Sequence, residues 1–187
     1  MPNSDPDTNL VWIDLEMTGL DWNVHRILEI ACIVTNCNLE ILEEGPQIVI
    51  HQPEKLLGTI DSETKSHIGL DLIEQSQKST VSEKEAEQRI LELVKKHCHP
   101  GKGVVCGNGI YIDRAFLFQQ MQELNGYLYY RNIDVTSLKE LYKRWRPGEA
   151  LYVKMDNHRA LDDIKDSIAE LKYYRQVGFI IGADAKI

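Results

Sequence analysis

Residues 10–19 read Leu-Val-Trp-Ile-Asp-Leu-Glu-Met-Thr-Gly, an apolar, β-prone run with two carboxylates two positions apart. Side chains on a strand alternate between faces, so Asp14 and Glu16 share one face with Trp12. The other face carries Val11, Ile13 and Leu15. Two like charges on a mostly buried strand repel each other and lose hydration, so a cation is expected between them. Oxygen ligands suit Mg²⁺ or Mn²⁺; the alternatives are solvation at a strand end or pairing with an arginine.

Length and composition indicate one globular domain. The chain has 187 residues, of which 43% are hydrophobic and 27% charged, enough for a single core. We expect one domain with a core over about residues 9–176. No apolar run reaches the ~20 residues of a membrane-spanning helix, and the first residues resemble neither a signal peptide nor a mitochondrial presequence. A cytoplasmic protein without membrane contact is therefore expected, or a mitochondrial one if a presequence has been removed.

The net charge of −8 argues against binding nucleic acid over a broad basic surface. A polyanionic substrate held locally by metal ions remains compatible with this charge. Such a substrate should be short, because few phosphates can be neutralised outside the site.

Hydrophobic periodicity predicts strands and helices in an order typical of α/β proteins. Strands are expected over 10–16, 27–35, 39–42 and 47–51, the last two separated by Glu-Glu-Gly-Pro, and then over 104–106 and 132–135. Helices are expected over 82–98, with Ser82 as N-cap, 112–124, 136–145 and 159–175. This order predicts a mixed sheet with helices on its faces.

Further acidic residues lie near predicted helix starts. Asp113 follows a Gly-Asn-Gly turn, and His158 is followed by Asp162 and Asp163. Each acid alone is explained by the helix dipole or by capping, and helical spacing does not choose between Asp162 and Asp163. Together with the first pair they come from elements whose ends converge in open α/β sheets. Two divalent ions could then act on a phosphodiester, with His158 accepting a proton from water.

Four segments carry a resemblance to a known family. They are Trp-Ile-Asp-Leu-Glu-Met-Thr-Gly-Leu (12–20), Gly-Asn-Gly-Ile-Tyr-Ile-Asp-Arg-Ala-Phe-Leu (107–117), Tyr-Arg-Asn-Ile-Asp-Val (130–135) and His-Arg-Ala-Leu-Asp-Asp-Ile (158–164). The chain resembles the oligoribonucleases, within the DEDD 3′→5′ exonucleases that carry a catalytic histidine. The resemblance implies an RNase H-like fold with a five-stranded mixed sheet. It also implies a homodimer that degrades RNA of two to about five nucleotides to nucleoside 5′-monophosphates.

The resemblance also assigns residues to roles. It gives Asp14, Glu16, Asp113 and Asp163 to two Mg²⁺ or Mn²⁺ ions and makes His158 the general base. It selects Asp163 over Asp162, because the family motif places the acid five residues after the histidine.

The substrate-binding residues that the resemblance implies are Leu20, His67, Asn108, Tyr130 and Thr136. Leu20 would wedge against the terminal base, and Tyr130 would reach the site across the dimer interface. Three tyrosines in residues 127–131 suit such an interface, although core packing is the alternative. The chain departs from the family at Ser62, where a base-stacking tryptophan is usual, and at Gly109 and Thr136, where serines are usual. Trp22 or another aromatic residue could replace the missing tryptophan.

Three rival functions fit parts of the pattern. A proofreading-type DNA exonuclease would use the same metal core. A non-catalytic nucleic-acid-binding module should have lost a metal carboxylate, and none is missing. A structural Ca²⁺ site would normally need a Dx[DN]x[DN]G loop, which is absent from the sequence.

Overall fold

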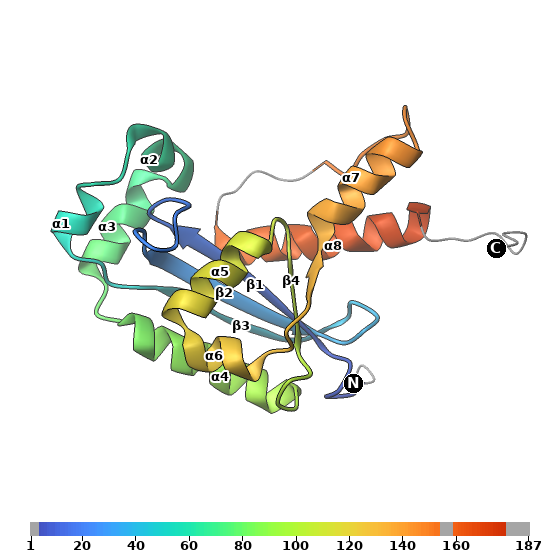
Figure 1. Cartoon of the computed structure of the whole chain (residues 1–187), viewed down its shortest axis with the longest axis horizontal. Coiled ribbons are helices and arrows are strands. Elements are labelled where there is room, and N and C mark those ends of the chain that lie inside the picture. The colour runs from blue at the N-terminus through green and yellow to red at the C-terminus, as the bar shows by residue number, and fades with distance from the viewer. Residues whose placement is uncertain (1–3, 154–158, 179–187) are drawn as a thin grey trace, which may run out of the picture.

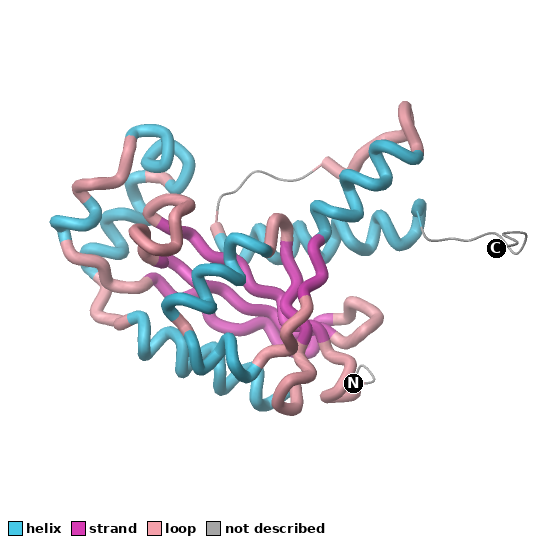
Figure 2. The backbone as a smooth tube through the Cα atoms, in the orientation of Figure 1, coloured by secondary structure: helices cyan, strands magenta, loops and turns pink. Residues whose placement is uncertain are grey.

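The computed structural model describes residues 4–153 and 159–178. Its centre is a five-stranded mixed sheet in the order β3-β2-β1-β4-β5. The strands are Leu10–Met17 (β1), Ile27–Thr35 (β2), Ile41–Val49 (β3), Val104–Gly107 (β4) and Asn132–Asp134 (β5). The first three strands pair antiparallel, while β4 runs parallel to both β1 and β5. The predicted mixed sheet with flanking helices is confirmed (Figures 1 and 2).

Helices cover both faces of this sheet and one of its ends (Figure 1). They are Glu54–Leu57 (α1), Ser62–Ile68 (α2), Leu70–Lys78 (α3), Glu83–His97 (α4), Tyr111–Gln120 (α5), Gln122–Tyr127 (α6), Val135–Trp145 (α7) and Ala160–Gly178 (α8). The predicted cap of α4 is present, since Ser82 Oγ accepts the Glu85 N–H at 3.1 Å. Within the described residues, no helix combines the length and the apolar character needed to cross a membrane.

The alternation predicted for β1 divides the core into two layers. Val11, Ile13 and Leu15 pack with α4, α5 and α6 on one face. On the other face Trp12 packs with the apolar residues of α7 and α8. Asp14 and Glu16 follow Trp12 on that second face, so the strand's pleat points both carboxylates towards the layer that contains α8.

The predicted break between strands 39–42 and 47–51 is wrong. One irregular strand, β3, runs through this region, and its pairing with β2 shifts register in two places. A Cβ on Gly45 would lie 2.6 Å from the Cys32 carbonyl oxygen, so glycine allows the close approach. Pro46 is tolerated because β3 is at the sheet edge, where a missing N–H need not break a ladder.

The single helix predicted over 112–124 is also wrong. The helix breaks at Met121, and α6 starts anew with its N-terminus against α4. There the buried Glu87 carboxylate accepts the N–H groups of Glu123 and Leu124, at 2.7 and 3.1 Å. A break stabilised by a residue 36 positions away leaves no local signal in the periodicity.

Helices α1, α2 and α3 occupy residues for which the periodicity predicted no elements. They form a small apolar cluster of their own with Leu28 at one end of the sheet. This end is also where β1 finishes and α8 starts, so α2 forms one wall of the cavity described next.

Candidate active site

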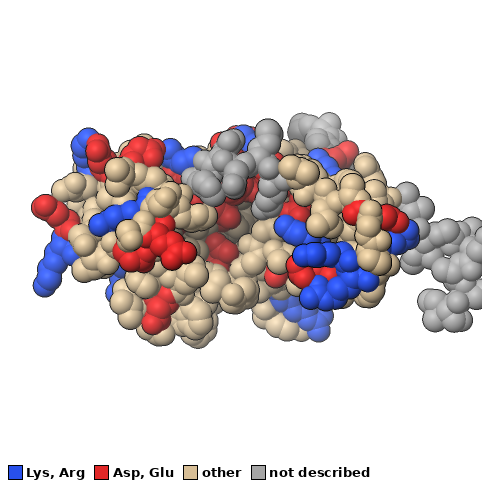
Figure 3. Space-filling view, turned by 90° about the horizontal axis from the view of Figure 1, so that it is seen from above, with Lys and Arg blue, Asp and Glu red and all other residues tan. Residues whose placement is uncertain are grey.

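Three carboxylates from two elements meet at the end of β1. Asp14 and Glu16 come from the strand, and Asp163 comes from the first turn of α8. Each offers an oxygen, and these oxygens lie within 4.8 Å of one another. We call these residues the acidic triad. Seen from above in Figure 3, acidic atoms lie at the bottom of a hollow in this face of the molecule.

The triad has the electrostatics expected of a cation site. Burial raises the pKa of Glu16 to about 8, and the negative charges of Asp14 and Asp163 add to the rise. The positive charge of Arg159 opposes it. Carboxylates this close repel one another unless a proton or a cation lies between them. The donor set is made only of carboxylate oxygens, so it fits a hard divalent ion such as Mg²⁺ or Mn²⁺.

Asp113 lies beside the triad but is not one of the three clustered acids. It is buried in the first turn of α5, where its Oδ1 accepts the Leu15 N–H at 3.0 Å. That N–H is available because the pairing of β1 with β4 ends at Trp12. Burial, followed by the charge of Asp14, raises the pKa of Asp113 well above its ordinary value. Asp113 and the triad line the same cavity.

The last motif is described only in part. His158 lies outside the described residues, so its predicted role stays a prediction. Asp162 and Asp163 both follow Arg159 into α8, where their N–H groups donate to the Arg159 carbonyl oxygen at 2.9 and 3.0 Å. Asp163 belongs to the triad, whereas Asp162 is exposed. The structure therefore distinguishes two neighbouring acids that helical spacing left equivalent.

The cavity around these acids has a volume of about 950 Å³, at the upper end of the roughly 300–1,000 Å³ usual for ligand pockets. Leu20 and His67, both predicted to bind substrate, line it from two different elements, a loop and α2. Gly19 adopts φ +154°, and a Cβ there would lie 2.6 Å from His25 Nδ1. Glycine is therefore needed for the loop to fold over its own histidine.

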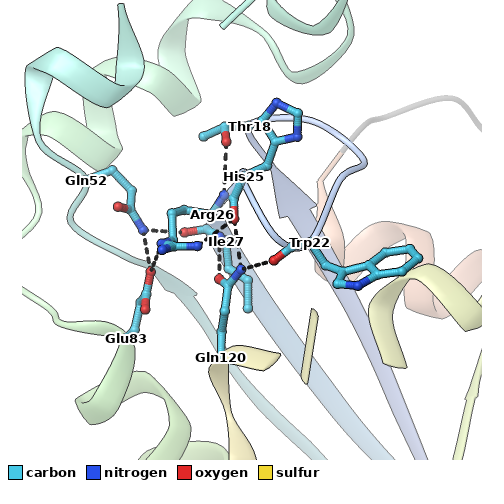
Figure 4. Close-up of polar contacts among 8 residues, drawn as sticks. All are labelled: Thr18, Trp22, His25, Arg26, Ile27, Gln52, Glu83 and Gln120. Carbon is cyan, nitrogen blue, oxygen red and sulfur yellow. Dashed lines mark hydrogen bonds and ion pairs between the residues drawn. The ribbon is translucent and has the colours of Figure 1, made fainter. Parts of the chain in front are cut away.

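The loop of residues 18–26, which carries Leu20, is anchored from outside (Figure 4). Gln120, the last residue of α5, donates from Nε2 to the carbonyl oxygens of His25 and Trp22, at 2.8 and 3.4 Å. Its Oε1 accepts the Ile27 N–H at 3.4 Å. One side chain thus ties two points of the loop to the start of β2.

Asn108 and Thr136 hold the turn that borders the cavity. Asn108 Nδ2 donates to Ser167 Oγ at 2.8 Å and to Glu170 Oε2 at 3.1 Å, and its Oδ1 accepts the Thr136 hydroxyl at 3.1 Å. The same hydroxyl oxygen accepts the Gly109 N–H at 3.0 Å. The N–H groups of Asn108 and the hydroxyl proton of Thr136 are thereby used within the protein, so either side chain would have to break one of these hydrogen bonds to donate to substrate.

Tyr130 lies away from the cavity of its own chain. It is 69% exposed and precedes β5, whereas the cavity lies where the parallel strands end. Of the three tyrosines in residues 127–131, Tyr127 follows the core-packing alternative, because it packs against the core and donates its hydroxyl to the Cys98 carbonyl oxygen at 2.9 Å. Ser62 and Trp22 are not among the described residues that line the cavity, so a stacking role for Trp22 stays a prediction.

Two residues near the site escaped the sequence interpretation. Glu29 is a buried carboxylate in β2 that binds Arg159. The sequence marks it only as the single charged residue of a nine-residue strand. Gln120 had no comparable signal, since an amide at the end of an amphipathic helix is unremarkable.

Comparisons with known proteins agree with this geometry. The family model RNase_T, described as Exonuclease, matches residues 11–171. The oligoribonuclease of Vibrio vulnificus (strain CMCP6) is 51% identical over 178 residues, covering 94% of this chain and 98% of the relative. The oligoribonuclease of Escherichia coli (strain K12) is 48% identical over 173 residues, covering 91% and 95%.

Among solved structures, the zinc-bound complex of Escherichia coli exonuclease I with single-stranded DNA superposes with a TM-score of 0.72 at 14% identity. The match covers 93% of this chain and 42% of that one, so this chain spans about two fifths of its length. At this identity the likeness shows the fold alone, and it confirms the predicted RNase H-like fold.

Proposed function

The chain belongs to the RNase_T exonuclease family and, within it, to the oligoribonucleases, and from this premise we propose that it is a metal-dependent 3′→5′ exoribonuclease acting on short RNA. The observation that carries the proposal is the acidic triad, whose oxygens lie within 4.8 Å of one another at a cavity of about 950 Å³. We propose RNA of two to about five nucleotides as substrate and nucleoside 5′-monophosphates as products.

The residues around the cavity would have different roles in hydrolysis. Asp14, Glu16 and Asp163 would hold a divalent ion, and Asp113 would support a second one beside Asp14. Bound there, Mg²⁺ or Mn²⁺ would acidify water and neutralise the charge that develops on the phosphate. His158 would accept the proton of the attacking water, because a neutral imidazole is a suitable general base near neutral pH.

The remaining residues would position the RNA. Leu20 lies on the cavity wall on a loop that Gln120 anchors, where its apolar side chain would pack against the terminal base. His67 faces the same space from α2. Because Tyr130 is not among the residues that line its own cavity, it would complete the site of a partner subunit in a homodimer.

The decisive experiment is product analysis on 5′-labelled RNAs of two to ten nucleotides in Mn²⁺, with DNA of matched sequence beside them. We expect stepwise shortening from the 3′ end, release of nucleoside 5′-monophosphates, and slower cleavage of DNA. Internal cleavage would contradict the exonuclease assignment, and equal or faster cleavage of DNA would favour a DNA-directed exonuclease.

Length selectivity should be shallow. A stacking aromatic is worth ~1–3 kcal/mol per base, and the resemblance to the oligoribonucleases implies that Ser62 stands where the family carries one. We therefore expect kcat/KM to differ less than ~100-fold, or ~2.7 kcal/mol, between two- and five-nucleotide RNAs. A steeper preference for dinucleotides would show that another group supplies the contact.

A further inference from the structure

Glu29 is a fully buried carboxylate that the proposed chemistry does not use. It lies in β2 directly opposite Glu16 of the acidic triad and is 0% exposed. Four donors surround it. Its Oε1 accepts from Arg159 Nε at 3.3 Å and from the Ala160 N–H at 3.2 Å, and its Oε2 accepts from Arg159 Nη2 at 2.8 Å and from Gln47 Nε2 at 2.9 Å.

These contacts fix the start of α8 against the sheet. Ala160 is the first residue of the helix, and a free N–H there needs an acceptor. Glu29 supplies it from another element, and its negative charge suits the positive end of the helix. The Glu29 carboxylate accepts hydrogen bonds from two nitrogens of Arg159, a geometry that fixes the orientation of the guanidinium as well as its distance.

The contacts of Glu29 with Arg159 and Ala160 are connected to the acidic triad by one turn of helix. The carbonyl oxygen of Arg159 accepts the Asp163 N–H at 3.0 Å, so the residue that Glu29 holds starts the turn that carries Asp163. Displacement of Arg159 would therefore displace Asp163 relative to Asp14 and Glu16, which belong to β1.

We propose that Glu29 and Arg159 are positioning residues that set the spacing of the acidic triad and thereby its affinity for a divalent ion. This inference rests on the proposed function, because it assumes that the triad binds metal. Partners that orient metal ligands typically change metal affinity or activity 10- to 100-fold when they are removed.

A purely electrostatic role of Glu29 and Arg159 predicts other changes in metal affinity than a positioning role does. Suppose that Glu29 and Arg159 affected the metal ion only through the electrostatic effect of their charges. Removal of the Arg159 cation would then strengthen metal binding, and Glu29→Gln would weaken it. A neutral pair, Glu29→Gln with Arg159→Met, would then restore the affinity of the unaltered protein. Positioning instead requires all three variants to bind metal more weakly.

The test is calorimetric titration of the metal-free full-length protein with Mn²⁺, without RNA. We expect Glu29→Gln, Arg159→Met and the double variant each to raise the Kd for Mn²⁺ by about 10-fold or more. Arg159→Lys should also raise it, because lysine keeps the charge but cannot bind both carboxylate oxygens in the same fork. This mildest variant covers the case in which a larger change prevents folding.

Glu87→Gln is the matched control. Glu87 is likewise buried, accepts two backbone N–H groups at the start of a helix, and pairs with Lys84 at 3.0 Å, but α6 carries no triad residue. This variant should lose thermal stability and keep the Kd for Mn²⁺. Unchanged affinity in the Arg159 variants, or tighter binding by Arg159→Met, would overturn the inference alone. Absence of Mn²⁺ binding by the unaltered protein would instead overturn the proposed metal site.

Discussion

Asp162 and Asp163 are adjacent acids in the same helical turn, yet only Asp163 belongs to the acidic triad. Asp163→Asn should reduce hydrolysis to background, because it removes one of three clustered carboxylates. Asp162→Asn serves as the control and should keep most activity, since its side chain is exposed. Initial rates on a labelled dinucleotide in Mn²⁺ test both variants. An essential Asp162 beside a dispensable Asp163 would refute the assignment.

Glu16 should make the metal-free protein less stable as the pH rises. Its pKa is about 8 in the folded state against an ordinary value of 4.5, so unfolding between these pH values releases a proton. The free energy of unfolding therefore falls from about pH 5 to pH 8, by several kcal/mol in order of magnitude at about 1.4 kcal/mol per pKa unit. Asp113, whose pKa is also raised, contributes in the same direction.

Denaturant titrations at pH 5, 6.5 and 8 with a chelator measure this effect. Glu16→Gln should flatten the pH dependence and leave the protein more stable than the unaltered chain at pH 8. Saturating Mn²⁺ should remove most of the loss, because a bound cation stabilises the ionised carboxylates. A stability that stays level, or that rises with pH in chelator, would contradict the buried, mutually repelling triad.

His158→Ala should lower kcat by ~10²–10⁴, the usual contribution of a positioned general base, with little change in the Kd for Mn²⁺. In the unaltered enzyme, kcat should rise with pH through the imidazole pKa, since only the neutral ring accepts a proton. Single-turnover rates from pH 5.5 to 8 measure the profile. The same rise in His158→Ala would assign it to another group.

At the scale of elements, the site depends on how one loop is attached to one helix. Gln120 ties the 18–26 loop to α5 (Figure 4), so Gln120→Ala should loosen the loop that carries Leu20. We expect a higher KM for dinucleotides with kcat changed less, because the acidic triad does not depend on this loop. Steady-state kinetics of Gln120→Ala test this. The control is Gln119→Ala, because Gln119 is exposed and lies next to Gln120 on the same helix. An unchanged KM would mean that the loop keeps its shape without the anchor.

At the scale of the whole molecule, the proposed homodimer predicts that Tyr130, which is exposed and outside the cavity lining of its own chain, acts in the site of the partner subunit. Tyr130→Ala subunits and Asp163→Asn subunits should each be inactive alone. Mixed dimers should recover part of the activity, because one of their two sites then has an intact triad and an intact partner tyrosine. Mixtures of Asp14→Asn with Asp163→Asn provide the control, since every site in them lacks an acid. Failure of rescue in verified mixed dimers would contradict a shared site.

Much of this architecture is determined by short stretches of the sequence. The period-two pattern of residues 10–17 determined both faces of β1 and placed two carboxylates on the same side. The Ser82 cap and the apolar stripe after it predicted α4. Such features depend on backbone geometry over a few residues, so neighbours in sequence suffice to specify them.

Other features were decided only by the tertiary structure. The break before α6 depends on Glu87 of α4, and the continuity of β3 depends on the close approach of Gly45 to Cys32. The same applies to the site: the proximity of Asp163 to Asp14 arises because α8 packs on one face of the sheet, with its first turn bound by Glu29. Sequence alone identified the acids, whereas their spacing results from contacts between residues more than 100 positions apart, which no local pattern records.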